Sequence, residues 1–471
     1  MPAGYPQALA KGRVNAMPYN LPSLQPVMPD FRGYRYPHLG QLWERLTAEP
    51  ELPQVDRWLS QQLRSQKQFG RQDRLFYADA LFTVMRYLLP LTLLEEGYQR
   101  QVSDMAAYAL ERDAELAGDR IWQAARELPA SVLWYWLIQL LPGTAEYPRE
   151  IEDEPFRTPY WERVQAQWAA DERLAWLLDG WRPAWHDWLA ERQQASGWTA
   201  EQVERFCTGQ NIRPPLWLRV QKPAQAAAVE QELKQVGFTV DADEDALKAR
   251  GGRSIFQTAA FRLGGIEIQD WASQQISRAV GARPGELIWD ACAGGGGKTL
   301  ALASRMNNLG AITATDIRAW KLEELKRRAK RAGWFNIRRF EWDAEAPLKL
   351  PREARQQGGF DRVLVDAPCT SAGTWRRNPD ARWRLSSHQV AELTRLQTRI
   401  LDQAAPAVRP GGTLVYATCS WLTAENEQLV MAWLQRQPEF RLSHQQLVGF
   451  PEADADTMYY AVLRRSEAPA Q

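Results

Sequence analysis

The run DACAGGGGKT at residues 290–299 decides the fold of the C-terminal half of this chain. It directly follows an apolar segment typical of a strand, and it precedes a stretch with helical spacing. The four consecutive glycines permit positive φ angles and let a ligand approach the backbone closely, while the N-terminus of the predicted helix offers N–H groups. We therefore expect a polar or anionic ligand at this turn.

Two common nucleotide-binding loops do not match this run. A P-loop requires glycine where Cys292 stands, and the GxGxxG motif requires glycine where Thr299 stands. An acidic residue followed by Gly-x-Gly is instead typical of Rossmann-type methyltransferases, in which S-adenosylmethionine lies across the strand ends. A flexible turn without a ligand is the alternative, but it leaves the position of the loop between strand and helix unexplained.

Strands and helices alternate from about residue 266 onward. The predicted strands are residues 287–289, 312–315, 337–341, 363–365, 414–417 and 460–463. This alternation is typical of a doubly wound, mostly parallel sheet. We therefore predict that residues 266–471 form an α/β Rossmann-like methyltransferase domain.

Acidic residues follow the second and third of these strands. Asp316 comes 20 residues after Gly296, the spacing at which a carboxylate reaches the ribose diol of a nucleoside. Asp343 is placed to accept a hydrogen bond from the adenine amino group. Either aspartate alone would more often be a helix N-cap, but beside the glycine-rich turn they favour a cofactor site. The residues predicted to bind S-adenosylmethionine are Cys292, Ala293, Gly294, Gly295, Gly296, Gly297, Lys298, Asp316, Asp343 and Asp366.

Two cysteines follow two further strands, Cys369 in the run DAPC and Cys419 in the run ATCS. Both therefore reach the carboxyl edge of the sheet, where open α/β proteins bind ligands. A single cysteine there would ordinarily be a small buried hydrophobic residue, but two thiols beside a methyl donor favour chemistry.

Methylation of a cytosine is a reaction that uses two thiols. Addition of a thiolate to carbon 6 makes carbon 5 nucleophilic enough to accept a methyl group, and a second group near the site then assists elimination. An acid such as Asp366 can hold the pyrimidine N3 and amino group. This chemistry gives roles to Cys369, Cys419 and Asp366 without deciding which thiol attacks.

Together these motifs resemble those of the Sun/Nop family of RNA cytosine-5 methyltransferases, the bacterial RsmB- and RsmF-like enzymes. The shared motifs run from QDWASQ at residues 269–274 to ENE at residues 425–427. The resemblance implies that Cys419 is the nucleophile and that Cys369 promotes release of the methylated product. It also implies methyl transfer from S-adenosylmethionine to carbon 5 of an RNA cytosine through a covalent cysteine–cytosine intermediate. Ribosomal RNA is the expected substrate class, with transfer RNA as the alternative.

One departure from the family pattern lies in the glycine-rich loop. The family loop commonly reads CAAPGGK, whereas Gly294 and Gly295 replace Ala-Pro here. The additional glycines loosen the loop, and we expect activity to be retained.

The N-terminal part of the chain has a different pattern. Residues 1–35 are predicted to be a loosely ordered tail, and residues 36–200 an α-helical domain in whose core the 11 tryptophans between residues 40 and 194 pack. Its run FGRQDR at residues 69–74 resembles the NusB-like RNA-binding domain of RsmB-like enzymes, and an unrelated helical domain is the alternative. Residues 201–265 are predicted to be a small ferredoxin-like α+β module, because PLWLRV at residues 215–220 resembles the one that precedes the family's catalytic domain.

Two basic clusters are candidates for RNA contact. Between residues 318 and 339 nine basic residues face two acids, and a solvated helix face is the default interpretation. Residues 375–384 interleave arginine with Trp375 and Trp383, which suits phosphate contact and base stacking and makes this cluster the better candidate. Its predicted RNA-binding residues are Arg376, Arg377, Arg382 and Arg384. The target base is expected in a loop or single strand, or flipped out.

Composition and charge exclude several classes. The 471 residues carry a net charge of +1, which conceals an acidic part, with 21 basic and 26 acidic residues in 1–200, and a basic remainder with 37 and 31. The four cysteines are too few and too far apart for a disulfide framework or a zinc site, so we expect a cytoplasmic protein without a metal. We also expect no membrane partner, because no apolar run suits a membrane span or a secretion signal.

Two other functions stay open. A non-catalytic RNA-binding or ribosome assembly factor on the same fold would use the helical domain as its working part, but the intact Cys369 and Cys419 argue against it. Methylation of DNA or of a small molecule is disfavoured by the Thr-Cys position of Cys419 and by the second basic cluster. RNA is therefore the expected partner.

Overall fold

The computed structural model describes residues 35–64, 66, 68–118, 120–141, 157–243, 246–252 and 254–467. Within these residues the chain divides into two compact units. The first extends to Arg213 and also contains Trp375–Ser386, and the second contains Pro214–Thr374 and the chain from Ser387 onward. The predicted tail lies almost wholly outside the described residues, and the predicted boundaries at residues 200 and 265 stay predictions.

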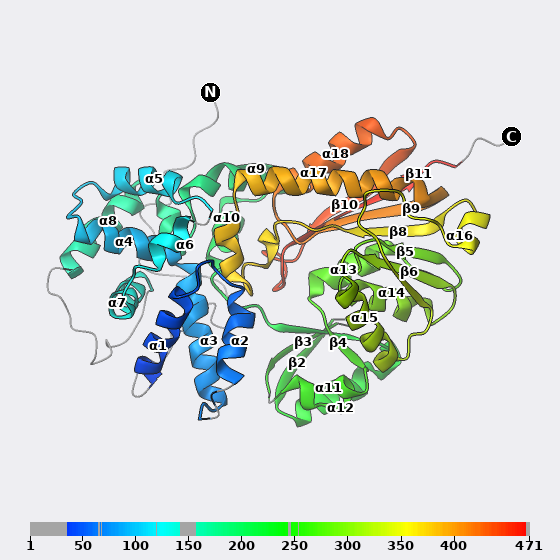
Figure 1. The fold of residues 1–471 in the computed structure, drawn as a ribbon, viewed down its shortest axis with the longest axis horizontal. Coiled ribbons are helices and arrows are strands. Elements are labelled where there is room, and N and C mark those ends of the chain that lie inside the picture. The colour runs from blue at the N-terminus through cyan, green and yellow to red at the C-terminus, as the bar shows by residue number, and fades with distance from the viewer. Residues whose placement is uncertain are drawn as a thin grey trace. The chain divides into compact units, whose positions relative to one another are not determined.

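The first unit is helical, as the sequence predicts for this region (Figure 1). Capping side chains begin some of its helices: Asp104 accepts from Ala107 N at the start of one, and Thr199 and Gln202 form a reciprocal capping box at another. Its α-helices are α1 (Arg35–Thr47), α2 (Val55–Arg64), α3 (Arg71–Arg86), α4 (Leu88–Gln99), α5 (Met105–Glu115), α6 (Arg120–Ala125), α7 (Ala130–Leu140), α8 (Arg157–Ala170), α9 (His186–Ser196) and α10 (Ala200–Gly209).

Tryptophan side chains fill much of the core of this helical unit. Trp43, Trp122, Trp134 and Trp136 are each at most 1% exposed. The rings of Trp43 and Trp122 meet edge to face with their centroids 6.3 Å apart. The interpretation of the abundant tryptophans as packing residues is therefore confirmed for these positions.

A short segment from the C-terminal half of the chain also belongs to the helical unit. This segment, Trp375–Ser386, contains the 3-10 helix η7 (Pro379–Arg384). Trp375 is fully buried, and its ring lies 4.7 Å from that of Trp185, centroid to centroid. The residues on either side of the segment belong to the second unit, so the segment interrupts the predicted methyltransferase domain.

The second unit begins with a four-stranded antiparallel sheet of order β2-β3-β1-β4. Apolar side chains on one face, including Leu218 and Leu247, pack against Val229 and Leu233 of the helix that follows β1. The elements are β1 (Leu216–Val220), α11 (Ala226–Gln235), β2 (Phe238–Asp243), β3 (Ala246–Gly251), α12 (Ala259–Arg262) and β4 (Ile266–Ile268). This is an α+β arrangement with the order β-α-β-β-α-β.

A seven-stranded sheet forms the rest of the second unit, in the order β10-β11-β9-β8-β5-β6-β7. The five strands from β9 to β7 are parallel, and β10 and β11 join them antiparallel. The chain runs from β5 to β6 and β7 on one side and returns through β8 and β9 on the other. Its strands are β5 (Leu287–Asp290), β6 (Ala311–Asp316), β7 (Ile337–Glu341), β8 (Phe360–Asp366), β9 (Val408–Thr418), β10 (Phe440–Val448) and β11 (Met458–Arg465).

Helices cover both faces of this sheet, each over its own apolar cluster. One face packs against α13 (Trp271–Val280), α14 (Gly297–Met306) and α15 (Ala319–Ala332). The other packs against α16 (Arg352–Gln356), α17 (Ser387–Ala404) and α18 (Glu427–Arg436). This is the doubly wound, Rossmann-like arrangement predicted from the sequence, and its reversal of strand order between β5 and β8 is where such sheets bind ligands.

The described residues include no single helix that is long and apolar enough to cross a membrane. Among the described helices, α3 and α4 taken together, with a bend of 69° between them, reach that length and composition.

Candidate active site

The glycine-rich loop joins β5 to α14 at the carboxyl edge of the large sheet. Gly296 has a φ of +88°, and a Cβ atom there would overlap the Leu325 side chain of α15, so only glycine fits. Gly294 has a φ of +54° but open space around it. The loop also contains Cys292 and Ala293, and Ala293 N donates to the carbonyl of Thr315 on β6. The loop is therefore held between β6 and α15.

Two of the predicted cofactor-binding aspartates lie at neighbouring strand ends. Asp316, at the end of β6, accepts a hydrogen bond from Gly294 N at 3.0 Å and another from Arg318 N at 2.9 Å. Asp343 is exposed and follows β7, the strand that pairs with β6. The structure thus brings Asp316 to the glycine-rich loop and leaves Asp343 open to solvent one strand further along.

A third aspartate, Asp290, ends β5 and is completely buried. One carboxylate oxygen accepts from Thr299 Oγ at 2.6 Å, while the other, Oδ1, has no hydrogen-bond partner among the described residues. Burial raises the pKa of Asp290 to about 7. An orphaned carboxylate oxygen beside a glycine-lined turn suits a ligand with a cationic N–H donor, and the amino group of S-adenosylmethionine is such a donor.

Lys298 and Asp366 form an ion pair beside this loop. Lys298, in the first turn of α14, places Nζ 2.7 Å from Oδ2 of Asp366 at the end of β8. Burial opposes the charged form of Lys298, but the Asp366 carboxylate outweighs burial and raises the pKa of the ammonium group. Lys298 therefore stays charged, and the pair offers a fixed donor and a fixed acceptor at the edge of the sheet.

The two predicted catalytic cysteines meet at this edge. Cys369 follows β8 and Cys419 follows β9, its parallel neighbour, and their Sγ atoms are 3.2 Å apart. Cys419 N donates to the sulfur of Cys369 at 3.3 Å, and Ser371 Oγ lies 3.5 Å from the sulfur of Cys419. Both cysteines are free thiols, and at this distance one sulfur can donate a hydrogen bond to the other.

The surroundings of the two thiols shift their pKa values in opposite directions. The hydrogen bond from Cys369 lowers the pKa of Cys419, with Ser371 and the charge of Lys298 acting in the same direction against burial. The same hydrogen bond, burial and the nearby Glu425 carboxylate hold the pKa of Cys369 well above its usual value. These shifts favour the ionised form at Cys419 over the ionised form at Cys369, so Cys369 is the better hydrogen-bond donor of the pair.

Glu425 and Asn426, from the run ENE, hold the loops that carry the cysteines. The fully buried Glu425 carboxylate accepts from Thr370 N and from Gln397 Nε2, both at 2.9 Å. Asn426 accepts from Thr418 Oγ1 at 2.6 Å and donates to the carbonyl of Ser420 at 2.9 Å. One residue thus fixes the turn after Cys369 and the next fixes both neighbours of Cys419.

Sequence reasoning missed the positioning roles of Ser371, Gln397 and Glu425. The motif ENE was visible, but the donors to its Glu425 carboxylate come from residues 28 and 55 positions away. Asp290 was visible as the acid of the loop motif, yet only the fold shows that one of its oxygens lacks a partner.

The prediction that residues 375–384 present arginine and tryptophan to RNA is wrong for most of the cluster. Arg376 and Arg382 are 1% and 0% exposed, and Trp375 and Trp383 are equally buried. Arg384 is partly exposed, but its guanidinium binds Asp380 and the carbonyls of residues 52 and 53. Arg377 is partly exposed, and its RNA contact stays a prediction.

The buried arginines bind main-chain carbonyls at the ends of helices instead of phosphates. Arg382 donates to the carbonyls of Arg86, Gly180 and Gln210, and Arg376 donates to that of Ile212. Burial lowers the pKa of Arg382 to about 9. Carbonyls at helix C-termini carry partial negative charge and stabilise such a cation, so this cluster anchors the segment within the helical unit.

Comparisons with known proteins place the chain in a family. The family model described as 16S rRNA methyltransferase RsmB/F matches residues 278–465. The ribosomal RNA small subunit methyltransferase B of Erwinia tasmaniensis is 34% identical over 315 residues, which cover 64% of this chain and 71% of the relative. This chain belongs to the RsmB/F family. S-adenosylmethionine is accordingly the cofactor, and the glycine-rich loop, Asp290 and Asp316 are the candidate residues that would hold it.

Other RsmB/F relatives match a smaller part of their length. The probable ribosomal RNA small subunit methyltransferase B of Bacillus subtilis is 35% identical over 258 residues, which are 54% of this chain and 56% of the relative. The matched region thus spans little more than half of that protein.

Solved structures share the fold of this RsmB/F chain. The crystal structure of PH0851 covers 92% of this chain and 98% of its own, with a TM-score of 0.66 and 23% sequence identity. NSun6 from Pyrococcus horikoshii, solved with SFG, covers 60% of this chain and 98% of its own, with a TM-score of 0.51 and 18% identity. Identities of this size establish the fold alone.

Proposed function

We propose that this chain transfers a methyl group from S-adenosylmethionine to carbon 5 of a cytosine in ribosomal RNA through a covalent adduct with Cys419. The observation that carries the proposal is the pair of thiols 3.2 Å apart, at the same sheet edge as the Lys298–Asp366 ion pair and the glycine-rich loop. The names of the relatives, which are ribosomal RNA small subunit methyltransferases, support ribosomal RNA as the substrate class.

Cys419 begins the reaction by adding its thiolate to carbon 6 of the cytosine. Asp366 and Lys298 hold the polar edge of the ring. The Asp366 carboxylate faces N3 and the amino group and balances the positive charge of the protonated pyrimidine intermediate. S-adenosylmethionine, when bound, supplies an electrophilic methyl group to carbon 5. The Cys369 hydrogen bond lowers the pKa of Cys419 and so favours the ionised form of the attacking sulfur.

Cys369 acts when the adduct breaks down. Carbon 5 first gives its proton to a water molecule acting as base, and the electrons of that C–H bond form the C5–C6 double bond as the C6–S bond breaks and the Cys419 thiolate leaves. The Cys369 S–H, within hydrogen-bond distance of the departing sulfur, stabilises the thiolate as the bond breaks. Loss of Cys369 therefore slows release of the product more than attack.

Methylation of an in vitro transcript of small-subunit ribosomal RNA, read by bisulfite sequencing, tests this proposal. We expect a clear 5-methylcytosine signal with the full chain and S-adenosylmethionine, and none with Cys419→Ala. Cys207→Ala is the matched control, because Cys207 is a buried cysteine of the helical unit and should leave the signal intact. Undiminished methylation by Cys419→Ala would overturn the assignment of the nucleophile.

The choice of RNA is tested in parallel. Transfer RNA and a DNA copy of the transcript are offered under the same conditions, and we expect the ribosomal transcript to be methylated fastest. A faster reaction on transfer RNA or on DNA would contradict the substrate class.

A further inference from the structure

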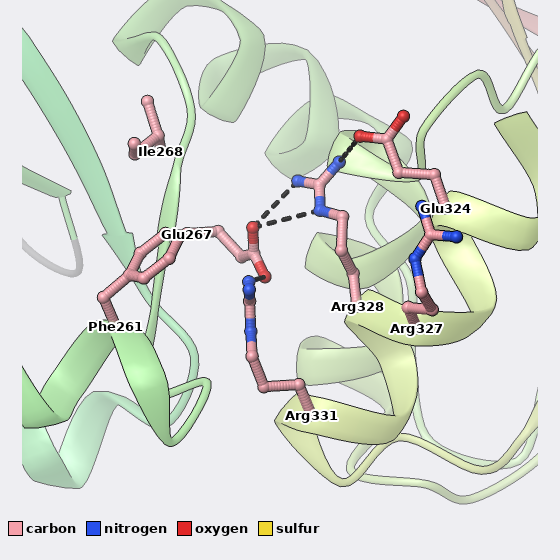
Figure 2. Close-up of a pocket in the computed structure, with 7 residues that line it drawn as sticks. All are labelled: Phe261, Glu267, Ile268, Glu324, Arg327, Arg328 and Arg331. Atoms are coloured by element: carbon pink, nitrogen blue, oxygen red, sulfur yellow. Dashed lines mark hydrogen bonds and ion pairs between the residues drawn. The ribbon is translucent and has the colours of Figure 1, made fainter. Parts of the chain in front are cut away.

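The second unit contains a basic pocket whose lining takes no part in the proposed chemistry. It lies between the four-stranded sheet and α15 and has a volume of about 560 Å³ (Figure 2). Its lining residues are Phe261, Glu267, Ile268, Glu324, Arg327, Arg328 and Arg331. Three arginines against two glutamates give the lining a net positive charge.

Glu267 orders two of these arginines. Its carboxylate is only 2% exposed and lies between two guanidinium groups, accepting from Arg328 Nη2 and from Arg331 Nη2, each at 2.8 Å (Figure 2). The Arg331 guanidinium also stacks over the ring of Phe261, 4.6 Å from its centroid. Glu324 also lies 3.8 Å from Arg328, so these four charges balance and the net positive charge of the lining comes from Arg327.

Arg327 supplies a third guanidinium that is already available to a ligand. It lines the pocket and is exposed, and it forms no hydrogen bond or ion pair with any residue in the described ranges. Figure 2 accordingly shows dashed lines at Arg328 and Arg331 but none at Arg327. A guanidinium recognises phosphate through two parallel N–H donors, so an anion with several oxygens is the ligand that such a pocket takes.

An exposed aromatic ring beside the pocket narrows the chemical class of ligand further. Phe256 is 61% exposed, and its ring meets that of the lining residue Phe261 edge to face, with 5.0 Å between centroids. Exposed aromatic rings next to arginines are typical of surfaces that bind single-stranded RNA, where the ring stacks on a base and the cations bind the backbone.

We propose that this pocket binds a backbone phosphate of the substrate RNA through Arg327, with a neighbouring base stacked on Phe256. The proposal rests on the proposed function, since it names a contact for the same RNA. It places RNA contact next to the cofactor loop, because Arg328, which shares the pocket, also donates to the carbonyl of Gly295 at 2.5 Å.

Filter binding of the full chain to the small-subunit ribosomal transcript, at several salt concentrations, tests the pocket. We expect Arg327→Ala to weaken binding about tenfold and to reduce the slope of log affinity against log salt by about 1, because one phosphate contact is lost. Phe256→Ala should weaken binding about fivefold without changing that slope, because stacking carries no charge.

Lys326→Ala is the matched control. Lys326 is exposed on the same helix, one residue before Arg327, and it does not line the pocket. We expect its substitution to change affinity by less than twofold. Identical binding curves for Arg327→Ala and Lys326→Ala would overturn the proposal.

The same samples separate this proposal from the proposed function. Suppose the unsubstituted chain methylates the transcript and Arg327→Ala binds the transcript as tightly as the unsubstituted chain does. The phosphate contact in the pocket is then refuted and the enzymatic function stands. If the unsubstituted chain neither binds nor methylates the transcript, both are refuted. Binding of polyglutamate is measured with the same variants. If Arg327→Ala weakens polyglutamate binding but not transcript binding, the pocket serves an acidic protein and the RNA contact is overturned.

Discussion

Two arginine-rich stretches of this chain have opposite surroundings. In Trp375–Ser386 the guanidinium groups of Arg376 and Arg382 are buried and bind main-chain carbonyls. On α15 the arginines instead pair with carboxylates, as Arg328 does, or face solvent, as Arg327 does. The density of arginine and its spacing from tryptophan therefore do not distinguish an anchor from an RNA-binding surface. Burial distinguishes them, and burial depends on residues far away in the sequence.

Of the substitutions that follow, Arg382→Ala should lower the free energy of unfolding most. It leaves the carbonyls of Arg86, Gly180 and Gln210 without their buried donor, and such losses cost about 3–5 kcal/mol. Arg377→Ala, in the same segment but partly exposed, should cost less than about 0.5 kcal/mol. Thermal unfolding followed by circular dichroism compares the two, and equal melting temperatures would show that the segment is not an anchor.

The carboxylates at the strand ends repeat the contrast between buried and exposed charge. Because the pKa of Asp290 is about 7 in the folded chain and 3.8 ordinarily, the folded state binds a proton that the unfolded state has released. Stability from this group is thus present at low pH and is lost as pH rises towards 7, by roughly 1.4 kcal/mol per pH unit. Asp290→Asn should remove this slope and exposed Asp343→Asn should keep it. Urea unfolding at pH 5, 6 and 7 measures it, and a slope unchanged in Asp290→Asn would contradict the account.

Two arginines bind Glu267, and comparing them separates support of the glycine-rich loop from ion pairing alone. Arg328 binds both Glu267 and the carbonyl of Gly295, whereas Arg331 binds Glu267 but not Gly295. Losing the hydrogen bond to the loop is worth about 1 kcal/mol, so Arg328→Ala should bind S-adenosylmethionine about fivefold more weakly. Arg331→Ala should bind it almost normally. Calorimetric titration decides, and equal affinities in the two variants would remove Arg328 from the support of the loop.

An exposed ion pair should have the smallest effect. Arg338 and Glu353 are 3.0 Å apart, and both side chains are about half exposed. Water and salt screen such a pair, so Arg338→Ala should leave the urea midpoint of unfolding almost unchanged. A midpoint clearly lower than that of the unsubstituted chain would show that the surface pairs of this region matter more than their exposure suggests.

The sequence allowed the large sheet and its catalytic edge to be predicted because both depend on local patterns. Each predicted strand of the sheet is present, most of them one to six residues longer than expected at an end. Cys369 and Cys419 meet because parallel strands bring their carboxyl ends together, which follows from topology alone. The strand β10 was missed, because its run FRLSHQQLV mixes polar and apolar residues with an irregular pairing in the register.

Features that depend on distant partners could not be predicted in this way. The burial of Arg376 and Arg382 requires carbonyls from residues 86 to 212, and nothing within residues 375–384 indicates them. The roles of Glu425 and Ser371 likewise require the fold, since each acts on a loop about 50 residues away. Assignment of attack to Cys419 came from a family resemblance, and the structure adds a physical reason in the unequal surroundings of the two thiols.

The division of labour between the two thiols is tested most directly by trapping the covalent adduct. Cys369→Ala, Cys419→Ala and the unsubstituted chain are incubated with S-adenosylmethionine and the ribosomal transcript, and protein–RNA adducts are resolved on a denaturing gel and located by mass spectrometry. The account predicts that Cys369→Ala accumulates an adduct on Cys419 because release fails, and that Cys419→Ala forms none. An adduct on Cys369 in the Cys419→Ala variant would contradict it.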